Sequence, residues 1–130
     1  MLPAGSETAT TKKLRFLLIE DEALILLNLK SALKDLGWEV SGTAAKIDAA
    51  MKVARTGSFD AAIIDINLDG SMTYPVADIL RERAIPFAFT TGYGRTAIDN
   101  AYSEIPILQK PFSHDQLKNV VSRLLPARAE

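Results

Sequence analysis

The sequence contains no cysteine, which excludes disulfide bonds and thiolate metal sites. Its single histidine, His114, has no second ligand at metal-binding spacing, so we interpret it as a surface residue. No apolar run approaches the roughly 18 residues of a membrane span, and the first residues lack the apolar core of a secretory signal. We therefore expect a cytoplasmic protein without direct membrane contact.

An excess of positive charge is also absent, since 15 Lys and Arg stand against 16 Asp and Glu, for a net charge of -1. The basic residues are scattered and form no stripe that would neutralise phosphates, so direct nucleic-acid binding is not expected. The 130 residues, 48% of them hydrophobic, suffice for one compact domain. We expect a flexible tail over residues 1–13, one domain over 14–126, and no output domain.

Short apolar runs alternate with longer helix-like segments from Leu14 onward. Two expected helices end at Gly37 and Gly57, the residue type favoured at a helix terminus, and Ser113 with Gln116 fits a capping box. The alternation predicts an α/β fold, in which a five-stranded parallel sheet has helices on both faces. Strands buried on both sides explain the continuous runs "FLLI" and "AAII". The expected strands are 14–20, 39–44, 60–65, 86–91 and 106–110, and the expected helices are 21–37, 46–57, 74–84, 95–103 and 113–125.

Polar side chains follow the strands where each one ends. Glu20 and Asp21 follow the first strand, Asp65 ends the third, Thr91 the fourth and Lys110 the fifth. Ligands of open parallel sheets gather at these carboxyl ends, so we expect the side chains to converge. Three carboxylates close together need a compensating cation. Mg²⁺ suits an all-oxygen site with one or two direct carboxylates, and Lys110 supplies a second positive charge.

This arrangement is suited to phosphoryl transfer, in which positioning and charge neutralisation do most of the work. Asp65 is the candidate nucleophile. The Thr91 hydroxyl is placed to donate a hydrogen bond to the attached group, and Gly92 leaves room for that group. Asn67 is placed to orient water or to complete the metal shell.

Four motifs in this order resemble the CheY-like receiver domain of bacterial response regulators: "LLIEDE", "IIDINLDG", "FTTG" and "QKPF". The resemblance covers residues 14 to about 125. It implies a flavodoxin-like fold and a phosphoacceptor that catalyses its own phosphorylation and slow autodephosphorylation. The donor would be a histidine kinase or a histidine phosphotransfer protein, with signalling through a protein partner or service as a phosphate sink. The implied site consists of Asp65 as acceptor, Mg²⁺ held by Glu20, Asp21, Asp65 and the Asn67 main-chain carbonyl, and a cis peptide before Pro111.

One position departs from the family pattern. Receivers usually carry Tyr or Phe three residues before the lysine, where this sequence has Ile107. Activation is therefore expected to be relayed without the usual aromatic rotamer. The stretch "IPFAFTTGYG" resembles the FAT GUY subgroup of stand-alone receivers, which also lack this aromatic residue and work with kinases of the HWE type.

Three other interpretations fit parts of the sequence. "DINLDG" matches the opening of an EF-hand loop, but its twelfth position is Val76 instead of a bidentate Glu. A haloacid-dehalogenase-type phosphatase also attacks with a strand-end Asp, but it needs a carboxylic acid where Asn67 stands. An interaction module that is never phosphorylated would typically lack one of the charges that are intact here.

The helix expected over 21–37 has more apolar residues than one buried stripe requires. The surplus indicates either a deeply buried helix or an exposed apolar patch beside the site, and composition leaves both open. In the resembled family this helix helps to dock the kinase or phosphotransfer partner.

Overall fold

The computed structural model describes residues 13–92 and 98–125, and its centre is a parallel sheet of five strands in the order β2-β1-β3-β6-β7. The chain runs from β1 outward to β2 and then back across β1 to β3. The strand order therefore reverses between β1 and β3, which makes their carboxyl ends the topological switch point. The strands are β1 (Arg15–Ile19), β2 (Glu39–Ala44), β3 (Ala61–Asp65), β6 (Phe87–Thr91) and β7 (Ile107–Gln109).

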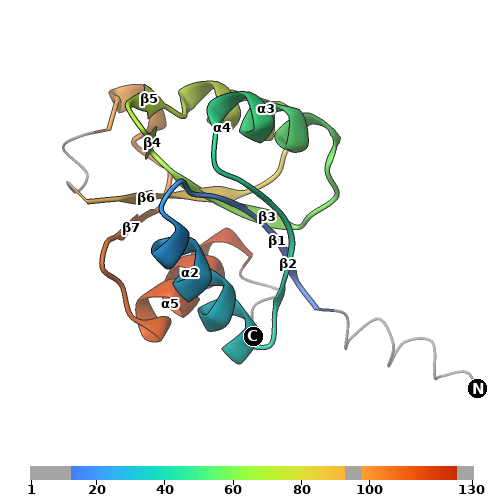
Figure 1. The fold of residues 1–130 in the computed structure, drawn as a ribbon, viewed down its shortest axis with the longest axis vertical. Coiled ribbons are helices and arrows are strands. Elements are labelled where there is room, and N and C mark those ends of the chain that lie inside the picture. Colours follow the sequence, from blue (N-terminus) through green and yellow to red (C-terminus); the bar gives the residue numbers. More distant parts are fainter. Residues whose placement is uncertain (1–12, 93–97, 126–130) are drawn as a thin grey trace, which may run out of the picture.

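Four α-helices in the described part of the chain cover the two faces of this sheet. They are α2 (Ala23–Asp35), α3 (Ile47–Thr56), α4 (Tyr74–Glu82) and α5 (His114–Leu124). Figure 1 shows α3 and α4 on one face and α2 and α5 on the other. The expected flavodoxin-like, doubly wound fold is thus confirmed. The expected capping box of the last helix is present between Ser113 and Gln116.

The helix expected over 95–103 falls partly outside the described residues, as does nearly all of the expected tail over 1–13. In the described remainder, a short 3-10 helix, η2 (Asn100–Tyr102), stands in its place. The Asp99 side chain caps it by accepting a hydrogen bond from Ala101 N at 2.9 Å. The structure therefore differs from the expected five α-helices by this one-turn element.

A hairpin that the sequence patterns did not predict follows β3. Its strands are β4 (Asn67–Leu68) and β5 (Ser71–Met72), which pair antiparallel. The two turn residues, Asp69 and Gly70, have φ angles of 48° and 93°. Positive φ at both central positions is typical of the type I′ turns that join two-residue hairpins, and Asp-Gly favours that turn.

The strand side chains alternate between two hydrophobic cores. Ala61 and Ile63 of β3 pack on the side of α2 and α5, whereas Ala62 and Ile64 pack on the side of α3 and α4. All four are fully buried, as expected for a strand covered on both faces. None of the helices in the described ranges has the length and apolar character that a membrane span requires.

Candidate functional site

The alternation of the strands decides which polar side chains share a face at the carboxyl edge. Leu18, Ile63 and Leu108 belong to the core beneath α2 and α5. Side chains in strands alternate with a period of two, so the next residue on that face of each strand is Glu20, Asp65 or Lys110. Glu20 and Asp65 come from the neighbouring strands β1 and β3, and β6 lies between β3 and β7, the strand that Lys110 follows.

One ammonium group is shared by the carboxylates gathered there. Lys110 Nζ lies 2.9 Å from Asp65 Oδ2 and 3.2 Å from Glu20 Oε1. It also lies 3.8 Å from Oε1 of Glu22, a residue that the sequence analysis did not single out. The run of three acids in "IEDE" was the available signal. Glu20 and Asp65 are only 1% and 5% exposed, so water screens this charge cluster poorly.

The Asp65 carboxylate is held in place by its own neighbours in the chain. Asn67 N donates to Asp65 Oδ1 at 3.1 Å. The Thr73 hydroxyl, which is fully buried, donates to the Asp65 carbonyl oxygen at 2.7 Å. Thr73 therefore anchors the end of β3 from the start of α4, a role that sequence patterns did not indicate.

The Asn67 side chain serves the hairpin, because its Oδ1 accepts a hydrogen bond from Gly70 N at 2.7 Å. Thr73 N donates to Ile66 O at 2.9 Å, so the next pair along the ladder, Asn67 with Met72, is the non-hydrogen-bonded type. In such a pair the main-chain N–H and C=O point away from the partner strand. The Asn67 N–H points to Asp65, and its carbonyl oxygen lies on the same side of the strand.

The Thr91 side chain lies on the opposite face of the sheet from Glu20, Asp65 and Lys110. It follows Phe89 in the alternation, onto the face of α3 and α4, and it is fully buried. Its carbonyl oxygen accepts a hydrogen bond from Lys110 N at 2.8 Å, which ties the ends of β6 and β7. Gly92 comes next and is exposed, with no described atom within 4 Å of where a Cβ would stand.

Ile107 occupies the β7 position opposite Phe89 and is partly buried against the core of α3 and α4. The aromatic side chains of this face come from other elements. The rings of Tyr74 and Tyr102 stack with centroids 4.5 Å apart, and Tyr102 also lies edge-on to Phe89.

Beyond β7, the peptide bond between Lys110 and Pro111 is cis, as the resemblance to receivers implied.

Burial dominates the electrostatics of Glu20. It raises the pKa of the Glu20 carboxyl from 4.5 to about 7, with a further rise from the Asp65 charge. The Glu22 N–H and the Lys110 ammonium act in the opposite direction without cancelling the rise. Burial alone would lower the pKa of Lys110, but the hydrogen bond and charge of Asp65, followed by the charge of Glu20, leave it above the ordinary value.

This shift predicts that the metal-free protein loses stability as pH rises from about 4.5 to 7, because the folded state holds a proton that the unfolded state releases. A raised carboxyl pKa gives stability that is complete below the unfolded value and lost above the folded one. The loss at pH 8 is of the order of 3 kcal/mol. Urea unfolding in EDTA at pH 5 and pH 8 measures it. Glu20→Gln should reduce the difference in unfolding free energy between the two pH values by that amount. If the variant and the wild type show the same difference, the assignment to Glu20 is wrong.

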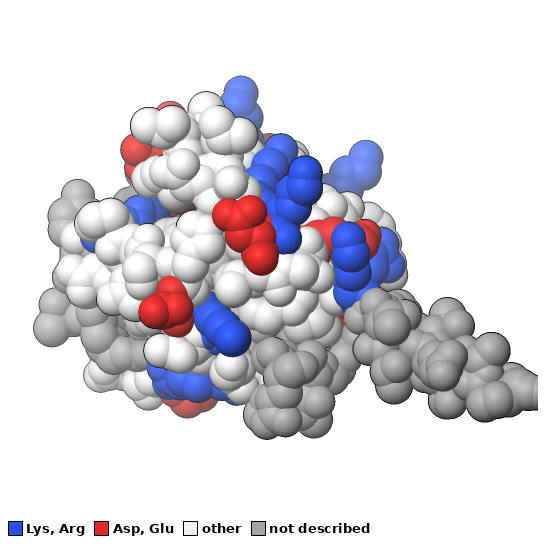
Figure 2. All heavy atoms as spheres, turned by 90° about the horizontal axis from the view of Figure 1, so that it is seen from below, with Lys and Arg blue, Asp and Glu red and all other residues white. Residues whose placement is uncertain are grey.

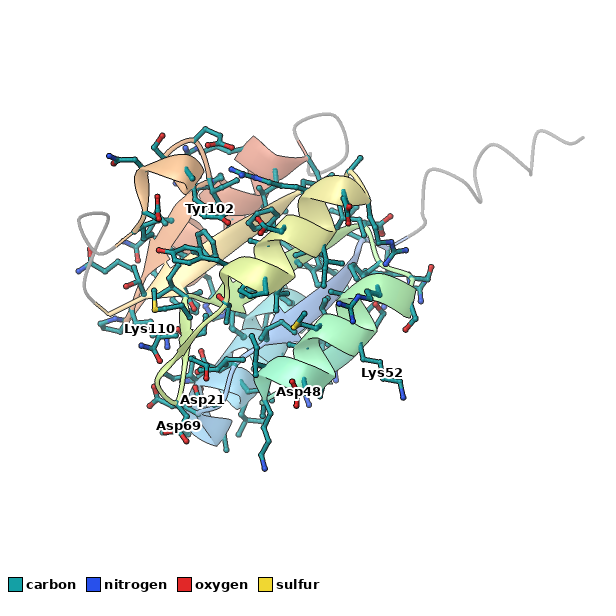
Figure 3. The ribbon with its side chains drawn as sticks, turned by 90° about the horizontal axis from the view of Figure 1, so that it is seen from above. Asp21, Asp48, Lys52, Asp69, Tyr102 and Lys110 are labelled. Atoms are coloured by element: carbon teal, nitrogen blue, oxygen red, sulfur yellow. The ribbon has the colours of Figure 1, made fainter. Side chains whose placement is uncertain are left out.

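The residues present fit a divalent cation that prefers oxygen. One carboxylate oxygen each from Glu20, Asp21 and Asp65 lies within 4.8 Å of the other two, and Asp21 is the most exposed of the three. Glu20 Oε1 is buried and ion-paired, yet among the described residues no donor is aligned to hydrogen bond with it. Figure 3 shows Asp21, Asp69 and Lys110 at the same end of the molecule. Mg²⁺, with metal–oxygen distances of about 2.1 Å, needs only small side-chain movements to bind here.

A doubly wound parallel sheet with an acidic cluster and a lysine at its switch point is the arrangement expected of a receiver domain. The chain belongs to the response regulator receiver domain family, whose model matches residues 16–122.

Individual relatives resemble the chain over most of its length. SdrG from Sphingomonas melonis Fr1, solved in solution, is 37% identical with a TM-score of 0.79, covering 87% of this chain and 97% of SdrG. The transcriptional regulatory protein PdtaR of Mycobacterium tuberculosis is 30% identical over 117 residues, covering 87% of this chain and 54% of PdtaR. The alginate biosynthesis transcriptional regulatory protein AlgB of Pseudomonas aeruginosa is 28% identical over 127 residues, covering 94% and 28%. The chain thus spans about half or less of these two regulators.

Proposed function

We propose that this chain is a cytoplasmic response regulator receiver that accepts a phosphoryl group on Asp65 in a two-component pathway. The observation that carries the proposal is the buried Asp65 carboxylate at the switch point, 2.9 Å from Lys110 Nζ and within metal-sharing distance of two further acids. A phosphatase of the haloacid-dehalogenase type is disfavoured, because it needs a carboxylic acid at position 67 for proton transfer. Asn67 has an amide there, and its Oδ1 accepts a hydrogen bond within the hairpin.

In the proposed reaction an Asp65 carboxylate oxygen attacks the phosphorus of a phosphohistidine or an acyl phosphate. The new O–P bond forms as the bond from phosphorus to the donor's nitrogen or oxygen breaks, and the leaving group keeps that electron pair. Lys110 turns from the Asp65 carboxylate towards the transferred oxygens. The Thr91 hydroxyl, at the carboxyl end of β6, becomes a donor to the attached group by turning over the end of the sheet towards Asp65. Glu20, Asp21, Asp65 and the Asn67 carbonyl would hold Mg²⁺, which neutralises the charge of the transferred group.

Incubation with acetyl phosphate and Mg²⁺ should add one phosphoryl mass to the intact chain, and EDTA should prevent the gain. The acids around Asp65 leave the site too negative for an incoming phosphate when the metal is removed. Intact-mass spectrometry measures the gain, and its loss at alkaline pH identifies an acyl phosphate. SdrG has been solved in a BeF3-activated conformation, which supports the use of beryllofluoride as a second probe. A chain that gains no mass from acetyl phosphate or from phosphohistidine proteins would contradict the proposal.

The phosphodonor protein is proposed to dock on the first turns of α2. Leu24 and Leu27 are 70% and 61% exposed there, so the surplus apolar residues form a patch instead of being buried. Beside the site, Ile25, Asn28, Lys110, Pro111 and Phe112 line a mostly apolar hollow of about 320 Å³. Figure 2 looks onto the face of α2 and α5 and shows charges of both signs interspersed on a largely uncharged surface. A histidine kinase, of the HWE type in particular, or a phosphotransfer protein is the proposed occupant.

The same labelling assay separates docking from chemistry when the donor is changed. The donor is the phosphorylated histidine kinase that labels the wild type fastest. With this donor, the labelling rate of the Leu24→Lys, Leu27→Lys double variant should fall by about tenfold or more. With acetyl phosphate it should keep the wild-type rate, because neither leucine contributes to the charged cluster. Equal loss with both donors would place the defect in the site itself.

After phosphorylation, the protein is proposed to signal through a protein partner or to drain phosphoryl groups from the kinase.

A further inference from the structure

Thr90, the residue before Thr91, carries a buried hydroxyl that the site described above does not use. Thr90 is 1% exposed, and its Oγ1 has no hydrogen-bond partner in the described part of the chain. A buried hydroxyl in this condition loses its hydrogen bonds to water and gains none in return, which destabilises the fold. Such groups are uncommon in native proteins, and each one calls for a physical reason.

The position of Thr90 supplies that reason. It stands directly opposite Asp65 of β3 on one side and Leu108 of β7 on the other. By the alternation of β6 it follows Ala88, which belongs to the core beneath α2 and α5. Thr90 therefore shares a face with Asp65, its immediate cross-strand neighbour.

Lys110 passes over the same residue. β6 lies between β3 and β7 in the sheet, so a side chain from the end of β7 must cross β6 to reach β3. Lys110 does so, since its Nζ lies 2.9 Å from Asp65 Oδ2. Thr90 is the last β6 side chain on the face that Lys110 crosses, which puts its hydroxyl under the ion pair.

We propose that the Thr90 hydroxyl is a second hydroxyl donor to the phosphoryl group on Asp65, distinct from Thr91 and lying on the opposite face of β6. The inference rests on the proposed function. The Asp65 carboxylate does not reach this hydroxyl in the unmodified protein. A phosphoryl group brings three strong acceptor oxygens and extends beyond the carboxylate, so the orphaned donor gains a partner only when Asp65 is modified.

Affinity for beryllofluoride in the presence of Mg²⁺ tests this role, because the ligand imitates the phosphoryl group without turning over. Thr90→Val keeps the shape of the side chain and removes the hydroxyl, and should weaken binding about tenfold or more. Thr90→Ala, which is smaller and cannot clash, should show the same loss. Thr90→Ser restores a hydroxyl and should bind within about threefold of the wild type. Isothermal titration gives the constants.

Thermal unfolding without beryllofluoride provides a readout of the opposite sign. Thr90→Val removes an unpaired buried hydroxyl, so its midpoint should rise by about 2–8 °C. Thr73→Val is the matched control, since it removes an equally buried hydroxyl that has a partner, the Asp65 carbonyl at 2.7 Å. Its midpoint should fall. If Thr90→Val is more stable than the wild type but binds beryllofluoride more weakly, damaged folding cannot be the cause of the weaker binding.

The outcomes separate this inference from the function on which it rests. If Thr90→Val and Thr90→Ala bind beryllofluoride as tightly as the wild type, Thr90 is no donor and the inference fails while the proposed function stands. If Thr90→Ser binds as weakly as Thr90→Val, the hydroxyl is not what matters, and the inference fails as well. If the wild type does not bind beryllofluoride, or Asp65→Asn binds it equally well, the proposed function itself fails.

Discussion

An Asp65→Asn variant is expected to take up no phosphoryl group from acetyl phosphate under conditions that label the wild type fully. Asparagine keeps the size of the side chain but replaces a charged oxygen nucleophile with an amide, which attacks phosphorus far more slowly. The labelling rate should fall on the order of a thousandfold or more. Intact-mass spectrometry over a time course measures it.

The matched control for this variant lies four residues further on. Asp69 is an exposed aspartate in the hairpin turn, with a φ of 48° that asparagine also tolerates. Asp69→Asn makes the same chemical change outside the charged cluster, so it should be labelled like the wild type. Equal labelling of the Asp65 and Asp69 variants would remove Asp65 as the acceptor.

Lys110→Met should have opposite effects on two properties of the same site. The Lys110 ammonium lies within 4 Å of three carboxylates, and its removal leaves them without a cation of the chain's own. Labelling by acetyl phosphate should slow by about 100-fold to 1000-fold, because the charge that meets the transferred oxygens is gone. Affinity for Mg²⁺ should increase by about tenfold or more, since a positive charge no longer repels the ion.

Methionine is one atom shorter than lysine but replaces its apolar stem with a chain of the same shape, so packing over β6 changes little. Titration calorimetry measures Mg²⁺ affinity, and the mass time course measures labelling. Lys118→Met, which changes an exposed lysine of α5, should leave both unchanged. Weaker Mg²⁺ binding in Lys110→Met would mean that the lysine supports the metal site indirectly, and the shared-ammonium description would be wrong.

The elements predicted best from sequence are those with local signals. The strand expected over 39–44 is found at Glu39–Ala44, and the helix expected over 113–125 at His114–Leu124. The capping box of Ser113 and Gln116 is a contact between residues three positions apart, so it can be recognised without the fold. The hairpin after β3 was not predicted. Its Asp69-Gly70 turn is a signal, but strands of two residues have too little alternation to support it.

The strand-end positions of Glu20, Asp65 and Lys110 could be predicted, because short apolar runs stop at polar residues and parallel strands end at one edge. The contacts of Glu22, Thr73 and Thr90 could not. Each depends on strand order, on the face that a side chain takes, or on the direction of the chain after a turn.

The sequence by itself determined the type and order of the elements and the kind of side chain at each strand end, because these follow from periodicity and from residues close together in the chain. Only the tertiary structure decided which of those side chains meet. It joined Lys110 to Asp65 across β6, tied Thr73 to the end of β3, and left Thr90 without a partner among the described residues. These are relations between segments far apart in the chain, and they exist only once the sheet has formed.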